Sequence, residues 1–303
     1  MLNQSKTPYD LSDQDGIEES ELHAALEALN SADAVVIAAS NGFDIVDGYN
    51  QFTCDQEFLQ KFGDFHQEYG LKCMLQGLVA YWPNNRIRWA FLARLLKCGY
   101  LDYQSSEAMK ILTELTKDIP RFVVTCNCNS RFIRAGFDPN AIFETEGSYT
   151  RLRCSDFCSD ELFAALPLMQ SLVEEAGSAC SATSVSSALP QCPHCGSILD
   201  VAVDDSDVLR HTRLFQQQHK RYQEFLKTFQ DKHIVILELG VGQQNKAIKL
   251  PLMKYAETAP YCSYVVCNGE SACLPIGLDD RAFVFQGDLG MTLKSIYEIN
   301  KAG

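Results

Sequence analysis

Four of the 13 cysteines in this 303-residue chain form two close pairs, and their spacing predicts a metal site. Cys154 and Cys158 are separated by three residues, Cys192 and Cys195 by two, and Gly196 directly follows the second pair. Four thiolates in two such pairs can surround Zn²⁺ as a tetrahedron, and the glycine permits the tight turn around the second pair. Because four protein ligands leave no position for water, we expect this zinc to be structural and not catalytic.

Polar residues and glycines follow three apolar runs in the last third of the chain. Residues 234–239, 264–267 and 282–286 are read as strands of an open α/β sheet, which binds ligands at the carboxyl ends of its strands. Glycines there allow backbone amides to approach a phosphate or ribose, the Asn and Glu side chains after the second run can bind ribose hydroxyls, and Gly287 with Asp288 can border a flat base. The candidates are Gly240, Gly242, Asn268, Glu270 and Asp288. Each of them, taken alone, is also a common turn residue.

The elements that must position these residues alternate between strands and helices. The apolar run 34–39 is typical of a parallel strand buried on both faces, and a second strand is expected at 121–125. Helical patterns cover residues 18–29, 55–115 and 207–229. Residues 40–49 contain two glycines and are expected to form a loop. This alternation indicates an α/β fold with a doubly wound, Rossmann-like parallel sheet.

The charge balance argues against two classes of partner. Asp and Glu number 39 and Lys and Arg 26, which gives a net charge of −13. Such a chain would be repelled by a phosphate backbone or an anionic membrane surface, so we expect neither nucleic acid nor membrane as a partner. Its apolar runs are far shorter than the roughly 20 residues that span a bilayer, and its polar start does not resemble a secretory signal. We therefore expect a cytoplasmic protein.

Read in chain order, these segments resemble the sirtuin family of NAD-dependent enzymes. The resemblance extends from residue 34 to 293: residues 125–132 stand where sirtuins have Thr-Gln-Asn-x-Asp, and residues 142–147 where they have a His-Gly pair. The chain is most similar to the macrodomain-linked class of bacteria and fungi, which shares a wide first zinc pair and segments like 237–242 and 286–288. The resemblance implies NAD as co-substrate, ADP-ribosyl transfer to a lipoylated carrier protein of the glycine cleavage type, and a macrodomain protein as the reversing partner.

The first glycine segment departs from the sirtuin pattern. Sirtuins have Gly-Ala-Gly-x-Ser, whereas this chain has Ser40, Asn41, Gly42 and Asp44 at the corresponding places. We take all four as dinucleotide-binding candidates. The side chains of Ser40 and Asn41 are expected to crowd the pyrophosphate, and the Asp44 carboxylate is expected to repel it.

The catalytic segments depart as well. Glu146 stands at the place of the catalytic histidine, where the macrodomain-linked class has glutamine, and Asn129 stands in place of an aspartate. Asn127 matches the family's asparagine, which implies that it orients nicotinamide or ribose. A carboxylate at 146 could stabilise the positive charge that develops on ribose as nicotinamide leaves. Alternatively, Glu146 is a tolerated replacement. We take Asn127 and Glu146 as the catalytic candidates and Asn129 as a cofactor contact.

We expect a large Rossmann-like domain formed by residues 18–44, 119–147 and 230–300. A helical insertion at 45–118 and a zinc module at 148–212 should form a smaller domain, with the ligand cleft between the two. The leading hypothesis is an NAD-dependent protein ADP-ribosyltransferase. One alternative is a degenerate protein that binds a nucleotide or docks a partner without turnover. Another is an NAD-dependent deacylase, which the missing histidine base weakens.

Overall fold

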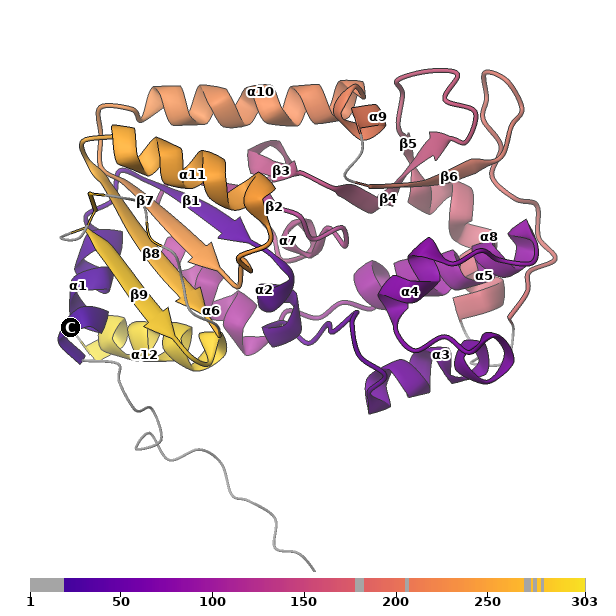
Figure 1. The fold of residues 1–303 in the computed structure, drawn as a ribbon, viewed down its shortest axis with the longest axis horizontal. Helices are drawn as coiled ribbons and strands as arrows, with labels where there is room; N and C mark the ends of the chain where they lie inside the picture. The colour runs from indigo at the N-terminus through magenta and orange to yellow at the C-terminus, as the bar shows by residue number, and fades with distance from the viewer. Residues whose placement is uncertain are drawn as a thin grey trace, which may run out of the picture.

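Six segments of the chain pair into one parallel sheet (Figure 1). The computed structural model describes residues 19–177, 183–204, 207–269, 274, 277–278 and 281–302. The strands are β1 (Ala34–Ala39), β2 (Arg121–Thr125), β3 (Ile142–Glu144), β7 (Ile234–Leu239), β8 (Cys262–Asn268) and β9 (Ala282–Gln286). Their order is β3-β2-β1-β7-β8-β9, and every neighbouring pair is parallel. The strand order therefore reverses between β1 and β7, which confirms the predicted doubly wound sheet.

Helices cover both faces of this sheet (Figure 1). One face packs against α1 (Glu19–Asn30), α6 (Glu107–Thr116) and α12 (Leu289–Ala302), the other against α10 (Arg213–Thr228) and α11 (Lys246–Thr258). Because side chains alternate along a strand, Val35 and Ile37 of β1 belong to the first core and Ala34 and Val36 to the second. Both cores need apolar side chains, which explains why β1 is one continuous apolar run.

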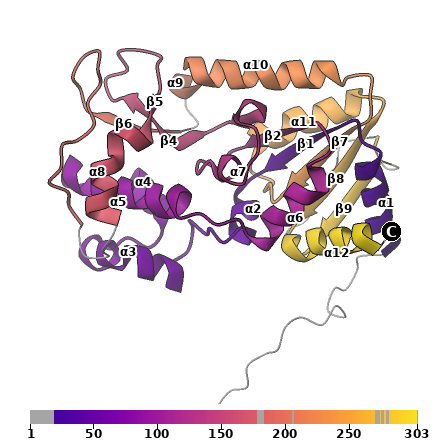
Figure 2. The same cartoon turned by 180° about the vertical axis from the view of Figure 1, so that it is seen from behind.

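The smaller part of the molecule lies at the end remote from α1 and α12 in both views (Figures 1 and 2). It contains α3 (Gln56–Tyr69), α4 (Met74–Val79), α5 (Asn85–Leu96), α8 (Ala165–Gly177) and an antiparallel sheet of β4 (Gly147–Cys154), β5 (Phe163–Ala164) and β6 (Leu199–Val203). Its core is separate and rich in aromatic residues such as Phe62, Phe91 and Trp89. Arg94 of α5 reaches into this core and pairs with Asp64 at 2.5 Å, so its buried charge is compensated.

Two segments differ from the sequence-based expectation. Residues 40–49 are not a plain loop, because α2 (Asn41–Val46) begins directly after β1 and buries Phe43 in the core of the parallel sheet. The helix expected at 207–229 is divided into α9 (Asp207–Arg210) and α10. The division follows from Thr212, whose hydroxyl accepts a hydrogen bond from the backbone amide of Phe215 and so starts a new helix.

Short elements complete the connections. They are a π-helix at Lys97–Leu101 after α5, α7 (Arg131–Arg134) after β2, and a 3₁₀ helix at Pro139–Ala141 before β3. None of the helices in the described ranges combines the length and the apolar character needed to cross a membrane.

Candidate functional site

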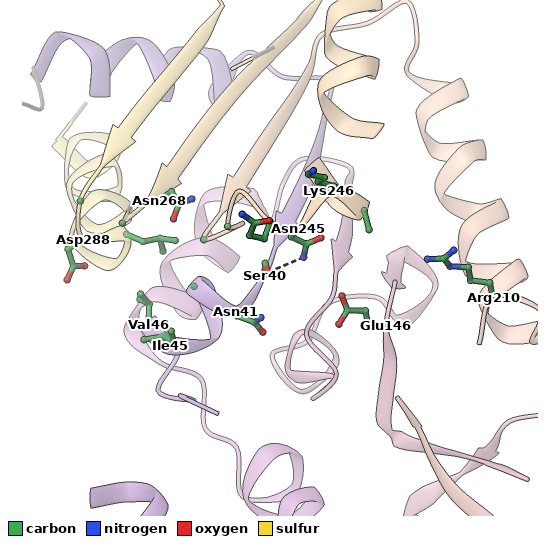
Figure 3. A pocket seen from close by; sticks show the side chains of 18 residues that line it. Ser40, Asn41, Ile45, Val46, Glu146, Arg210, Asn245, Lys246, Asn268 and Asp288 are labelled. Atoms are coloured by element: carbon green, nitrogen blue, oxygen red, sulfur yellow. Dashed lines mark hydrogen bonds between the residues drawn. The ribbon is translucent and has the colours of Figure 1, made fainter. Parts of the chain in front are cut away.

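A cavity of about 740 Å³ lies at the carboxyl edge of the parallel sheet (Figure 3). Its walls are formed by the segments that directly follow β1, β7, β8 and β9, together with Glu146 and Arg210. Its size falls in the range of roughly 300–1,000 Å³ that is usual for sites of small molecules and cofactors. The sequence-predicted residues that line it are Ser40, Asn41, Gly42, Glu146, Gly240, Gly242, Asn268 and Asp288.

Two glycines bring the chain together at the floor of the cavity, where the strand order reverses. The backbone amide of Gly42 donates a hydrogen bond to the carbonyl of Gly240 at 3.1 Å. A Cβ atom at Gly42 would lie 2.6 Å from the Gly240 Cα atom, and Gly240 itself has a φ of 61°. A larger residue at either position would push apart the segments that follow β1 and β7. The contact keeps side chains away from the place where the fold predicts a ligand.

Ser40 is fixed by side chains from two other segments. Its Oγ atom lies 3.0 Å from the Cys126 Sγ atom, and the Asn245 amide donates to Ser40 Oγ at 3.3 Å and to Cys126 Sγ at 3.1 Å. Burial, followed by the Glu146 carboxylate, raises the pKa of the Cys126 thiol to about 12. Cys126 therefore stays a neutral thiol that holds the serine hydroxyl in place.

Asn127 lies directly beneath this floor and does not line the cavity. Its Nδ2 group donates to the carbonyl of Ser40 at 3.2 Å. Its Oδ1 atom is buried and has no hydrogen-bond partner among the described residues. A buried acceptor without a partner is costly in free energy, and this one lies next to the residue that begins the cavity segment after β1.

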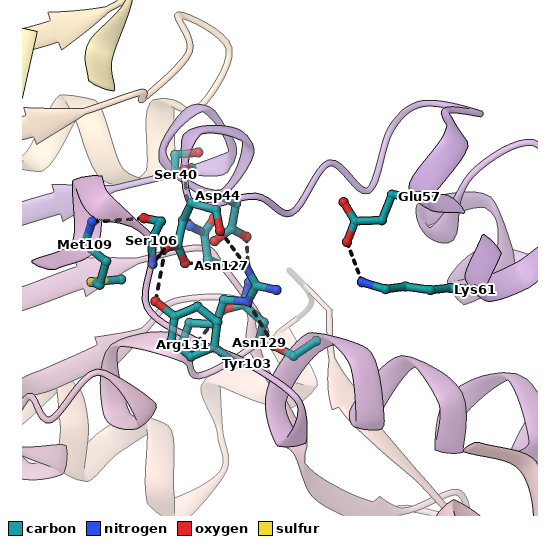
Figure 4. Close-up of polar contacts among 12 residues, drawn as sticks. Ser40, Asp44, Glu57, Lys61, Tyr103, Ser106, Met109, Asn127, Asn129 and Arg131 are labelled. Carbon is teal, nitrogen blue, oxygen red and sulfur yellow. Dashed lines mark hydrogen bonds and ion pairs between the residues drawn. The ribbon is translucent and has the colours of Figure 1, made fainter. Parts of the chain in front are cut away.

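Asp44 and Asn129 pair with each other away from the cavity (Figure 4). Asn129 Nδ2 donates to Asp44 Oδ2 at 2.7 Å, and Asn129 Oδ1 accepts from the backbone amide of Arg131. Burial raises the pKa of Asp44 to about 7, although the Asn129 hydrogen bond and the charge of Arg131 act in the opposite direction. This geometry differs from the expectation for Asp44: its carboxylate lies on the buried side of α2, bonded to Asn129, and Asp44 does not line the cavity.

Glu146 enters the cavity from the segment between β3 and β4, on the side of the smaller part (Figure 3). Its backbone carbonyl accepts a hydrogen bond from the amide of Asp204 at 3.2 Å, which fixes the segment at this point. Its carboxylate is near enough to raise the pKa values of Cys126 and Cys128, after the larger effect of their burial. The structure thus brings a carboxylate to the cavity wall that is opposite Asn268 and Asp288 (Figure 3).

Asn268 and Asp288 also stabilise the segments in which they lie. Asn268 Nδ2 donates to the carbonyl of Val241 at 3.0 Å, and Asp288 Oδ1 accepts from the amide of Met291 at 2.9 Å at the start of α12. The two readings that the sequence left open, ligand binding and turn formation, are therefore compatible. Glu270, the remaining candidate of this group, lies outside the described residues.

Further polar residues line the cavity that the sequence had not singled out as site residues: Gln244, Asn245, Lys246 and Arg210. The first three continue the glycine segment after β7 into the start of α11, where Asn245 Oδ1 accepts from the amide of Ile248. Because these three residues follow a predicted strand, the sequence alone could have identified them as site candidates. Arg210 comes from α9, far away in the sequence, and only the tertiary fold brings it to this site.

A buried ion pair anchors α11 to the sheet beneath the cavity. Lys249 Nζ lies 2.5 Å from Glu238 Oε1, and the hydroxyl of Tyr264 donates to Glu238 Oε2 at 2.7 Å. Burial and the neighbouring Glu238 carboxylate raise the pKa of Tyr264, so its hydroxyl remains a donor. Because these three residues join β7, β8 and the first turns of α11, they fix the helix end that carries Asn245 and Lys246.

The four paired cysteines come together at the antiparallel sheet, as their spacing predicted. Their Sγ atoms all lie within 4.8 Å of one another, with Cys154 3.5 Å from Cys195 and Cys158 3.5 Å from Cys192. Zn–S bonds of about 2.3 Å in a tetrahedron place sulfur atoms about 3.8 Å apart, so the donor set and its geometry suit Zn²⁺. Cys154 ends β4, and the metal would join this strand to the turn around Cys192 and Cys195.

Comparison with known proteins agrees with this architecture. No family model matches the chain. A protein ADP-ribosyltransferase of Staphylococcus aureus is 24% identical over 264 residues, which cover 86% of this chain and 82% of that protein. A structure of a Sir2 enzyme, studied for its mechanism and regulation, superposes with a TM-score of 0.58 at 18% identity and covers 94% of this chain and 99% of its own. This chain has the sirtuin fold.

Two more relatives refine this assignment. A Sir2 homologue in complex with NAD has a TM-score of 0.55 at 16% identity over 92% of this chain and 94% of its own. A probable bifunctional ADP-ribose hydrolase/ADP-ribosyltransferase of Fusarium oxysporum f. sp. cubense is 24% identical over 240 residues, which cover 75% of this chain and 38% of that protein. The resemblance seen in the sequence is thereby confirmed as a sirtuin fold with distant homology to sirtuin-like ADP-ribosyltransferases.

Proposed function

We propose that this sirtuin-fold chain is a protein ADP-ribosyltransferase that uses NAD. The observation that carries the proposal is the cavity at the strand-order reversal, where glycines, amide side chains and carboxylates lie together. The fit to a dinucleotide is supported by the Gly42–Gly240 contact, because neither residue places a side chain in the cavity. The homologues named as ADP-ribosyltransferases support the same activity.

The residues divide the cavity into regions with different tasks. Asn268 and Asp288 can bind the hydroxyls of the adenosine ribose, while Gly42 and Gly240, which have no side chains, leave room for a diphosphate to approach the backbone closely. NAD, when bound, supplies a ribosyl group joined to nicotinamide as leaving group. In our proposal Glu146 lies beside that ribose and stabilises the positive charge that develops as the bond breaks.

Transfer is favoured over deacylation because of the group at position 146. Sirtuin deacylation needs a base for a ribose hydroxyl, and a histidine is suited to that task near neutral pH. Glu146 offers a carboxylate, which stabilises a cation better than it accepts a proton at that pH. For the acceptor we propose a lipoylated carrier protein of the glycine cleavage type, with a macrodomain protein that removes the modification. The Fusarium relative, named for both a hydrolase and a transferase activity, supports such a pairing.

The test is nicotinamide release and ADP-ribosylation of a lipoylated carrier, with the same carrier lacking lipoate as control. The matched variant is Glu146→Gln, which keeps the shape of the side chain and removes its charge. We expect release to fall by about 100-fold or more in this variant while NAD affinity changes little. A Glu146→Gln variant as active as the wild type would show that the charge has no catalytic role.

A second candidate function is nucleotide binding without turnover. It is favoured by the side chains of Ser40 and Asn41, which occupy the cavity floor where sirtuins have smaller residues. The same assays separate the two functions. If calorimetry detects NAD binding but no nicotinamide is released with any carrier, the binding function should replace the transferase.

A further inference from the structure

A chain of three side chains leads from the antiparallel sheet to the cavity wall. The hydroxyl of Tyr149, on β4, donates to Gln51 Oε1 at 3.1 Å, and Gln51 Nε2 donates to Asn41 Oδ1 at 3.1 Å. Tyr149 and Gln51 are buried, with 2% and 8% of their surfaces exposed, whereas Asn41 lines the cavity. This hydrogen-bonded series of side chains therefore runs from the interior of the protein to the cavity.

The order of donors and acceptors in this chain decides which end of Asn41 remains for a ligand. A carboxamide has one oxygen that accepts and one nitrogen that donates. Tyr149 occupies the Gln51 oxygen, so the Gln51 nitrogen turns to Asn41 and occupies the Asn41 oxygen. The Asn41 Nδ2 group, which can only donate, is then the end that a ligand in the cavity can use.

The backbone holds all three residues in place, so that the chain is fixed before a ligand arrives. The amide of Tyr149 donates to the carbonyl of Cys128 at 2.8 Å, and the carbonyl of Gln51 accepts from the amide of Leu75 at 3.0 Å. Asn41 is the first residue of α2, directly before the Gly42 contact. A fixed donor at this place loses little conformational entropy when a ligand binds.

We propose that Gln51 and Tyr149 are positioning residues that orient the Asn41 carboxamide, so that its Nδ2 group donates to an anionic diphosphate at the carboxyl end of β1. This inference rests on the proposed function, because it requires a dinucleotide in the cavity. It reverses the expectation that Asn41 only crowds the pyrophosphate. Lys246, which lines the same cavity, adds a positive charge suited to the same anion.

The decisive variant is Gln51→Glu, measured at about pH 8, where a glutamate carboxyl is ionised. A carboxylate only accepts, so it would draw the Asn41 Nδ2 group toward itself and turn the Asn41 oxygen to the cavity. We expect the dissociation constant for NAD, measured by calorimetry, to rise by about 10- to 100-fold. Tyr149→Phe removes a single oxygen and should raise the dissociation constant for NAD by roughly 3- to 10-fold. Without the tyrosine hydroxyl, the carboxamide of Gln51 is free to rotate by about 180°.

The control separates orientation of Asn41 from a direct effect of the new charge. In the Asn41→Ala background, Gln51→Glu should have no further effect on NAD affinity, because the residue through which it acts is gone. Adenosine, which lacks a diphosphate, should bind all variants as it binds the wild type. Melting temperatures of the variants show whether each is folded. If Gln51→Glu does not fold, Tyr149→Phe provides the test.

The outcomes distinguish this inference from the proposed function. Equal NAD affinity in the wild type, Gln51→Glu and Tyr149→Phe would overturn the inference and leave the proposed function standing. A loss of affinity from Gln51→Glu that persists in the Asn41→Ala background would overturn it as well, since the charge would then act directly. A wild-type protein that binds neither NAD nor ADP-ribose would overturn the proposed function and this inference together.

Discussion

Replacing Asp44 by asparagine should stabilise the protein at neutral and alkaline pH. Asp44 lies on the buried side of α2, and this burial raises the pKa of its carboxyl from 3.8 to about 7. Below about pH 4 the group is protonated in both the folded and the unfolded chain, so it has no effect on stability. Between about pH 4 and 7 the unfolded chain releases the proton while the folded chain keeps it, so the free energy of unfolding falls as pH rises.

The size of this effect follows from the shift itself. A difference of about 3 pKa units corresponds to about 4 kcal/mol once the pH exceeds the folded-state value. The pKa of about 7 already includes the opposing attraction of Arg131, so this figure is the net cost of ionising Asp44 in the folded chain. The hydrogen bond from Asn129 is retained, since a carboxamide oxygen can accept it as well. Between about pH 5 and pH 8 the stability difference between variant and wild type should grow by about 3 kcal/mol.

Urea unfolding of the two proteins at both pH values measures this difference. Glu144, whose pKa burial also raises to about 7, is present in both proteins and cancels in the comparison. The control is Asp118→Asn, at an exposed position, for which no growth of the difference is expected. A stability difference for Asp44→Asn that does not change with pH would refute the burial of this carboxylate. Tighter NAD binding by the variant would instead restore the expectation that Asp44 faces the diphosphate.

Two further variants test other parts of the structure. Cys192→Ser should lower the melting temperature and release the metal, because the small sheet depends on zinc for its stability, and metal analysis of the wild type should find one zinc per chain. Lys249→Met should cost about 3–5 kcal/mol by leaving the buried Glu238 carboxylate without its cation, and Lys249→Met combined with Glu238→Gln should recover much of that loss, because a neutral carboxamide still accepts from the Tyr264 hydroxyl. If urea unfolding gives equal stabilities for the single and the double variant, the two side chains do not form a pair.

The sequence by itself determined the features that depend on local composition. The run at 34–39 is apolar throughout because both faces of β1 are buried, and that pattern is visible without a structure. The two cysteine pairs are close in sequence, so their ligand spacing could be recognised, and the glycines after β7 mark the end of a strand. The cavity also lies where the sequence argument placed a ligand, because the carboxyl ends of parallel strands meet at one edge of a sheet.

Tertiary structure decided which side chains face the cavity. Because residues 41–46 form a short helix, Asp44 turns inward to Asn129 while Asn41 lines the cavity. A helix of six residues gives too few turns for its periodicity to be read from a sequence. The partner of Gln51 is Tyr149, 98 residues away, and their hydrogen bond leaves no local pattern in either segment. Such pairings exist only once the sheet brings distant segments together, because hydrogen-bond geometry acts over a few ångströms of space and not along the chain.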